Sequence, residues 1–142
     1  MKALLDVSFL VALFDGGHVH HAVAHDWLIQ HRRLGWATCP LTQNGCLRII
    51  SQPVYPGCLP LVEIARRLRL ATRSRDHEFW PEGFAPTDES RFDLLRIPHP
   101  RMLTDAYLLA LAVSRKARLV TFDQGITTEA VHGASEQNIL RL

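Results

Sequence analysis

The chain has 142 residues, of which 47% are hydrophobic and 21% are charged, and its formal net charge is +2. This composition is typical of a globular protein with its own core and indicates neither a disordered chain nor a membrane protein. The net charge is too small to indicate nucleic-acid binding by itself, so that argument depends on local clusters of charge.

The predicted elements alternate between strands and helices. In chain order they are a strand at 2–5, helices at 7–14 and 18–33, a strand at 35–40, helices at 42–50 and 61–75, a strand at 77–80, a helix at 104–116, and strands at 117–122 and 138–142. Single helical turns are expected around 92–95 and 127–131. Ser8, Thr42 and Thr104 are the expected N-caps of their helices.

This alternation predicts one α/β domain over residues 1–142, a three-layer α/β/α sandwich with a mainly parallel central sheet. Residues 52–60 are rich in proline and glycine and are expected to form a loop within that domain. The three cysteines are odd in number and have no CxxC spacing, which favours the reducing cytoplasm over a disulfide framework or a zinc site.

Three aspartates lie at the ends of predicted elements. Asp6 follows the first strand, Asp105 lies in the first turn of the helix at 104–116, and Asp123 follows the strand at 117–122. Each residue alone is usual for a turn or a helix start. Because sites in open α/β sheets form outside the carboxyl ends of the strands, we expect the three carboxylates to converge.

Converging carboxylates repel one another, by roughly 3 kcal/mol per pair at about 5 Å and an effective dielectric constant of about 20. Such a site must hold a proton or bind a cation. A cluster of oxygen ligands without sulfur favours Mg²⁺, with Mn²⁺ as the alternative. Ser8 and Thr121, each two residues from an acid, are expected to orient the carboxylates through hydrogen bonds.

Basic residues gather on the predicted helix at 61–75. Arg66, Arg69 and Arg73 share one face of it, beside Arg67 and Arg75. This face either contacts only solvent, or binds the phosphates of RNA, or docks an acidic partner segment, and these alternatives stay open.

Histidines mark the start of the predicted helix at 18–33. His21 and His25 are one turn apart, a spacing that suits zinc, and His18 and His20 are close in sequence. No Cys, Asp or Glu completes an obvious ligand set. We interpret the cluster as a polar helix start with a solvated face.

Three segments carry a resemblance to a known family. They are Leu-Leu-Asp-Val-Ser near the start, Thr-Asp-Ala-Tyr-Leu-Leu-Ala-Leu-Ala late in the chain, and Leu-Val-Thr-Phe-Asp after it. In this order they resemble PIN-domain ribonucleases, most closely the VapC-type toxins of bacterial toxin–antitoxin pairs. The resemblance implies a Mg²⁺-dependent endoribonuclease toxin, with Asp6, Asp105 and Asp123 as catalytic residues and metal ligands that activate a water molecule.

The resemblance also implies an RNA substrate, a cognate antitoxin protein, a homodimer and a cytoplasmic location. Where the family usually has a further acid, this sequence has Gln43, which we expect near the aspartates without a charge to contribute. Arg48 matches the family's arginine and either contacts RNA phosphate or pairs with an acid. A DNA nuclease or phosphatase on the same acids, or a non-catalytic RNA- or protein-binding module with a site decayed at Gln43, are the alternatives.

Overall fold

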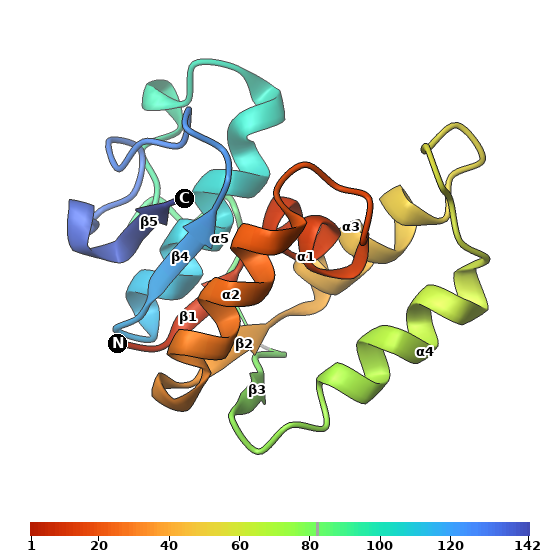
Figure 1. The fold of residues 1–142 in the computed structure, drawn as a ribbon. Coiled ribbons are helices and arrows are strands. Elements are labelled where there is room, and N and C mark those ends of the chain that lie inside the picture. Colours follow the sequence, from red (N-terminus) through yellow and green to blue (C-terminus); the bar gives the residue numbers. More distant parts are fainter. Residues whose placement is uncertain (82) are drawn as a thin grey trace.

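The computed structural model describes residues 1–81 and 83–142, and within them lies a five-stranded sheet of order β3-β2-β1-β4-β5 (Figure 1). All four strand pairings are parallel, which confirms the predicted α/β class. The strands are β1 (Ala3–Leu5), β2 (Trp36–Thr38), β3 (His77–Phe79), β4 (Arg118–Thr121) and β5 (Ile139–Arg141).

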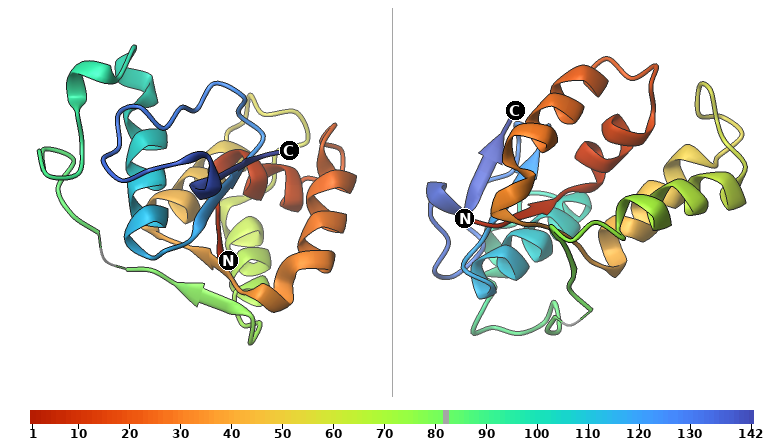
Figure 2. Two further views of the ribbon diagram at one scale, coloured as in Figure 1. Left: turned by 90° about the vertical axis from the view of Figure 1, so that its left-hand side faces the viewer. Right: turned by 60° about the horizontal axis from the view of Figure 1, so that its bottom comes forward.

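Helices cover both faces of the sheet and complete the predicted three layers. They are α1 (Val7–Phe14), α2 (His21–His31), α3 (Pro40–Ile50), α4 (Leu61–Ala71) and α5 (Leu103–Ser114). α5 packs on one face, and α1 and α2 pack on the other. α3 and α4 lie side by side next to α1, on the side of the molecule away from β5 (Figure 2).

The central strands are buried on both faces because their alternating side chains enter two different cores. In β1, Leu4 packs with α5, whereas Ala3 and Leu5 pack with α1 and α2. In β4, Leu119 packs in the core with α5, and Val120 packs in the core with α1 and α2. This double burial explains why all of β1 and the two central residues of β4 are apolar.

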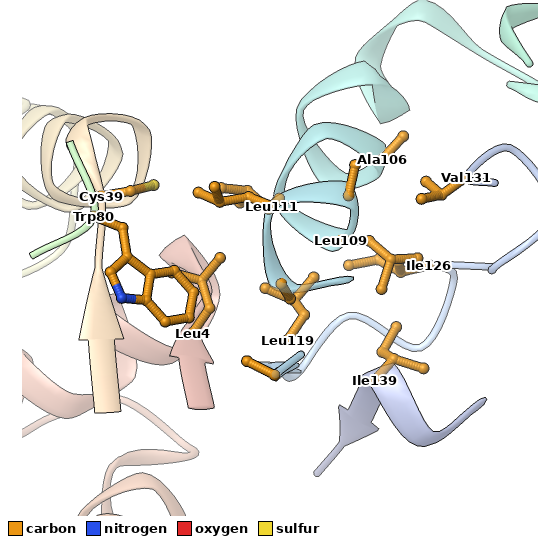
Figure 3. Packing of buried hydrophobic residues seen from close by; sticks show 14 of the residues in the cluster. Leu4, Cys39, Trp80, Ala106, Leu109, Leu111, Leu119, Ile126, Val131 and Ile139 are labelled. Atoms are coloured by element: carbon orange, nitrogen blue, oxygen red, sulfur yellow. The ribbon is translucent and has the colours of Figure 1, made fainter. Parts of the chain in front are cut away.

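α5 is apolar around most of its circumference because it lies between the sheet and the segment that leads to β5. In Figure 3 its Leu109 and Ala106 lie beside Ile126 and Val131, and its Leu111 lies toward Cys39 and Trp80. A helix enclosed on several sides has little need of a polar face. The polar residues of α5 are therefore confined to its ends, where Asp105 lies.

The predicted N-caps are wrong, because each of these side chains binds another group or lies inside its helix. α1 begins after Asp6, whose carboxylate accepts a hydrogen bond from the Val7 backbone. α3 begins at Pro40, and Thr42 in its first turn accepts from the Cys39 backbone. α5 begins at Leu103, and Thr104 therefore lies in its first turn.

Other predicted boundaries also shift. α2 starts three residues later than expected and is followed by a 3-10 turn at Arg32–Leu34, and α4 ends at Ala71 instead of residue 75. Residues 127–131 form turns instead of a helix, and a 3-10 turn lies at Leu94–Arg96. Within residues 1–81 and 83–142, no helix has both the length and the hydrophobicity needed to cross a bilayer.

Candidate active site

An open pocket of about 720 Å³ lies where β1 and β4 end, and all three aspartates line it. Asp6 directly follows β1, Asp123 follows β4 by two residues, and Asp105 lies in the first turn of α5. β1 and β4 are neighbours in the sheet, so parallel pairing brings their carboxyl ends to the same edge. Other lining residues include Ser8, His18, His20, Arg48, Arg101, Thr104 and Phe122.

Asp6 is the most enclosed of the three acids, with 4% of its surface exposed. One oxygen, Oδ1, accepts from the Val7 backbone at 2.7 Å. The other, Oδ2, accepts from the hydroxyls of Thr121 at 2.6 Å and Ser8 at 3.1 Å. Burial raises the pKa of Asp6 and these hydrogen bonds lower it, with Asp123 adding repulsion, and the net shift is upward.

The two hydroxyls beside Asp6 are themselves held by the backbone. Thr121 Oγ1 accepts from the Asp123 N–H at 2.9 Å, and Ser8 Oγ accepts from the Phe122 N–H at 3.1 Å. Each hydroxyl has one proton, which it donates to Asp6. Ser8 and Thr121 therefore connect the end of β4 to the carboxylate that follows β1.

Asp105 is partly buried and stands close to two other acids. Burial and, after it, the negative charges of Asp6 and Asp123 together raise its pKa to about 6. No hydrogen bond from the described residues offsets this effect. Among the three acids of this pocket, Asp105 is therefore the one whose negative charge is stabilised least by the described residues.

Asp123 is exposed and is fixed by its own turn. Its Oδ1 accepts from the Gly125 N–H at 2.8 Å, which holds the carboxylate over the loop that follows β4. Its negative charge raises the pKa of both Asp6 and Asp105. The three aspartates thus form one electrostatically coupled group.

The donor atoms of this group suit a hard divalent cation such as Mg²⁺. Three carboxylates line one pocket, sulfur ligands are absent from the pocket's described lining, and Asp105 has no hydrogen bond from any residue that the structure describes. However, among residues 1–81 and 83–142 no three His, Cys, Asp or Glu side chains are grouped tightly enough to hold a metal ion. The donors therefore fit Mg²⁺ in type and charge, but their placement forms no closed cage.

Gln43 has its hydrogen-bond partner outside the lining of the acidic pocket. Its Nε2 donates to Thr38 Oγ1 at 2.9 Å, at the end of β2, and it does not line the acidic pocket. Thr38 Oγ1 lies 2.9 Å from His77 Nε2 on β3. The amide of Gln43 is therefore held by hydrogen bonds toward β2 and β3, and its expected place beside the acids stays a prediction.

The predicted arginines divide into two groups. Arg48 reaches the acidic pocket, whereas Arg66 and Arg69 on α4 and Arg73 in the turn after it are exposed and do not line the pocket. Arg66 and Arg67 both bind Glu63, at 2.8 and 3.0 Å. These bonds lower the pKa of Glu63 to about 2. A role of Arg66, Arg69 and Arg73 in RNA binding stays a prediction, for residues that lie outside the lining of the acidic pocket.

Sequence reasoning did not identify Arg101, His20 or Phe122 as lining residues of the pocket. Arg101 precedes Asp105 by four residues in a nearly continuous helical run, and this spacing could have revealed their shared face. His20 and Phe122 are far apart in sequence, and no local pattern indicates their contact.

A second cavity, of about 390 Å³, lies beside the acidic pocket. Its described lining is mainly apolar and includes Trp80, Phe84, Tyr107 and Thr104, without an acid or a base. This cavity therefore offers no carboxylate that could bind a metal ion.

The sequence is similar to a known protein family and to individual proteins within it. The PIN domain family matches residues 3–128. The chain is 46% identical to Ribonuclease VapC44 of Mycobacterium tuberculosis over 142 residues, which is 100% of both proteins. It is 43% identical to Ribonuclease VapC38 of the same species over 130 residues, covering 90% of this chain and 89% of that protein.

A solved structure shares the fold. Mycobacterium tuberculosis VapC20, described as a sarcin-ricin loop cleaving toxin, superimposes with a TM-score of 0.62. The match covers 89% of this chain and 91% of that chain at 16% sequence identity. At this identity, the likeness shows the architecture alone.

Proposed function

This chain belongs to the PIN-domain family, among its VapC-type members, and we propose that it is a Mg²⁺-dependent endoribonuclease that acts as the toxin of a toxin–antitoxin pair. One observation carries the proposal: Asp6, Asp105 and Asp123 line a single open pocket at the carboxyl ends of β1 and β4. Full-length similarity to a protein named as a ribonuclease supports RNA as the substrate.

The three aspartates would hold the metal ion, with Mn²⁺ as the alternative to Mg²⁺. When bound, such an ion supplies an acidified water as nucleophile and neutralises negative charge on the phosphate. Ser8 and Thr121 keep the Asp6 carboxylate in one orientation through their hydrogen bonds. Asp105, with a pKa of about 6, is mainly ionised at neutral pH and available as a ligand.

Two arginines at the rim of the pocket would position the RNA. Arg48 on α3 and Arg101 before α5 line the same pocket as the three aspartates. Both are exposed, so their guanidinium groups can meet phosphate oxygens without a large desolvation cost. They offset the repulsion between three carboxylates and a polyanionic substrate.

The proposal includes a cognate antitoxin protein as partner, a homodimer and a cytoplasmic location. Exposed apolar side chains on α4, Leu61, Val62 and Leu70, support contacts with other protein chains. The thiols of Cys39, Cys46 and Cys58 are unpaired, which is compatible with a reducing compartment.

The test is cleavage of total bacterial RNA by the purified chain. Cleavage should require Mg²⁺ or Mn²⁺, stop with a chelator, and fall by orders of magnitude in Asp105→Asn. Asp26→Asn, an exposed change on α2, is the matched control and should cleave like the parent. DNA and a phosphomonoester offered in parallel address the alternative nuclease and phosphatase activities. Undiminished cleavage by Asp105→Asn would contradict the proposal.

A further inference from the structure

Three aromatic rings form a nearly parallel series from the core to the acidic pocket. Phe9 is fully buried on α1, Phe122 is partly buried after β4, and His20 is exposed before α2. The Phe9 and Phe122 rings are 5.8 Å apart with an interplanar angle of 12°. The Phe122 and His20 rings are 4.5 Å apart at 8°.

This arrangement fixes the position of an otherwise exposed side chain. His20 precedes α2, and its backbone N–H donates to Nδ1 of His18 at 3.0 Å, which holds the turn that carries it. Its ring makes no hydrogen bond with any described residue and is positioned by the stack on Phe122. An aromatic ring that is fixed but exposed can serve as a flat binding surface.

The series ends within the pocket that contains the acids. Phe122 and His20 both line it, and Phe122 directly precedes Asp123. Phosphate groups would bind between the carboxylate-held cation and the arginines, and the His20 ring offers a nonpolar flat surface beside them. In single-stranded RNA each phosphate is flanked by bases, which bind proteins by stacking on aromatic rings.

We propose that His20, supported by Phe122, is a stacking platform for a nucleobase of single-stranded RNA next to the bond that is cleaved. The inference rests on the proposed function and adds how the substrate is held. His20 is a positioning residue here, since it binds a base and takes no part in the proton or phosphoryl steps. Because any base can stack, the platform favours unpaired RNA over a particular base.

Binding measurements separate this inference from the proposed function. Fluorescein-labelled oligoadenylate is titrated with the Asp105→Asn chain in Mg²⁺, with and without His20→Ala, and anisotropy gives the Kd. A ribose-phosphate chain of the same length without bases is the second probe. We expect His20→Ala to weaken oligoadenylate binding about 10-fold and to leave binding of the baseless chain unchanged.

Two variants complete the design. His20→Phe keeps an aromatic ring without its nitrogens and should bind oligoadenylate like His20, whereas His25→Ala, an exposed change on α2 outside the pocket, should have no effect. Melting curves establish that all variants fold. An unchanged Kd for oligoadenylate in His20→Ala, or an equal loss with the baseless chain, would overturn the platform.

Failure of the proposed function gives a different result. If the parent chain cleaves no RNA but His20→Ala weakens only the probe that has bases, the platform stands and the ribonuclease assignment fails. If the parent cleaves RNA and His20→Ala binds both probes as before, the assignment stands and the platform fails.

Discussion

The hydroxyl of Thr121 donates a hydrogen bond of 2.6 Å to Oδ2 of Asp6, which connects the end of β4 to the residue after β1. The same oxygen of Thr121 accepts from the backbone of Asp123. One fully buried side chain therefore orients one acid of the pocket and fixes the backbone of another.

Thr121→Val should destabilise the fold by about 1 to 3 kcal/mol, because it leaves a buried N–H and a carboxylate oxygen short of a partner. Valine has nearly the same shape, so the loss reports the hydroxyl. Urea unfolding at neutral pH measures the effect, and the exposed Thr127→Val is the control. Equal stability of both variants and the parent would show that Thr121 has no such role.

The pKa of Asp105, raised to about 6 from 3.8, predicts a pH dependence of the metal-free chain. Between these values the folded state binds more protons than the unfolded state, so the free energy of unfolding falls as pH rises through this window. Two pKa units correspond to about 3 kcal/mol, which solvent screening at this partly exposed group reduces to about 1–2 kcal/mol.

Asp105→Asn removes the loss of stability that accompanies ionisation of Asp105, because the amide stays neutral at every pH. With chelator present, the variant should be about 1–2 kcal/mol more stable than the parent near pH 7.5 and equal to it near pH 4. For Asp26→Asn, an exposed change on α2, the difference in stability from the parent should not increase with pH. A stability difference that is constant across the pH range would contradict the raised pKa.

Gln43→Glu should leave the response to Mg²⁺ unchanged. Residue 43 faces Thr38, so a carboxylate there adds no metal ligand. The substitution should lower the free energy of unfolding by about 1 kcal/mol, because glutamate has no N–H to donate to the Thr38 hydroxyl, which is also hydrogen-bonded to His77. Melting curves across a Mg²⁺ titration measure both quantities, since binding to the folded state stabilises by RT ln(1 + [L]/Kd).

Asn44→Asp is the matched control for Gln43→Glu, because it adds the same charge to the exposed neighbouring position of α3. Both variants should follow the parent's dependence on Mg²⁺. A clearly tighter Mg²⁺ response in Gln43→Glu alone would place residue 43 among the metal ligands, and the hydrogen bond to Thr38 would then be replaced in the bound state.

Arg48 and Arg101 should contribute directly to RNA binding. Changing both to Gln should reduce the log–log salt slope for single-stranded RNA by about 1.4, using about 0.7 for each phosphate contact. The triple change of Arg66, Arg69 and Arg73 to Gln tests the predicted phosphate contacts along α4 and the turn after it, which require a reduction of the slope by about 2. An unchanged slope in the triple variant would identify that face as solvated or reserved for a protein partner.

The sequence predicted most of the fold because its signals are local. β1 and β4 are apolar runs that each lead to an acid, and α5 is an apolar stretch with an acid in its first turn. Parallel pairing then brings Asp6 and Asp123 to one edge without further information.

Gln43 and His20 could not be placed in this way because tertiary contacts decide their surroundings. The direction of the Gln43 side chain depends on Thr38 from β2, which also contacts β3. His20 is held by Phe122 from the far end of the chain. The exact helix starts were missed for a related reason, since Ser8 donates to an acid instead of capping α1.

The acidic pocket needs two segments that are far apart in the sequence, since Asp6 follows the first strand and Asp123 follows the fourth. During synthesis, the first acid leaves the ribosome long before β4 exists to donate to it. A nascent or truncated chain that stops before residue 123 therefore lacks one of the three acids, and the pocket can assemble only after β4 and the turn that follows it have been synthesised.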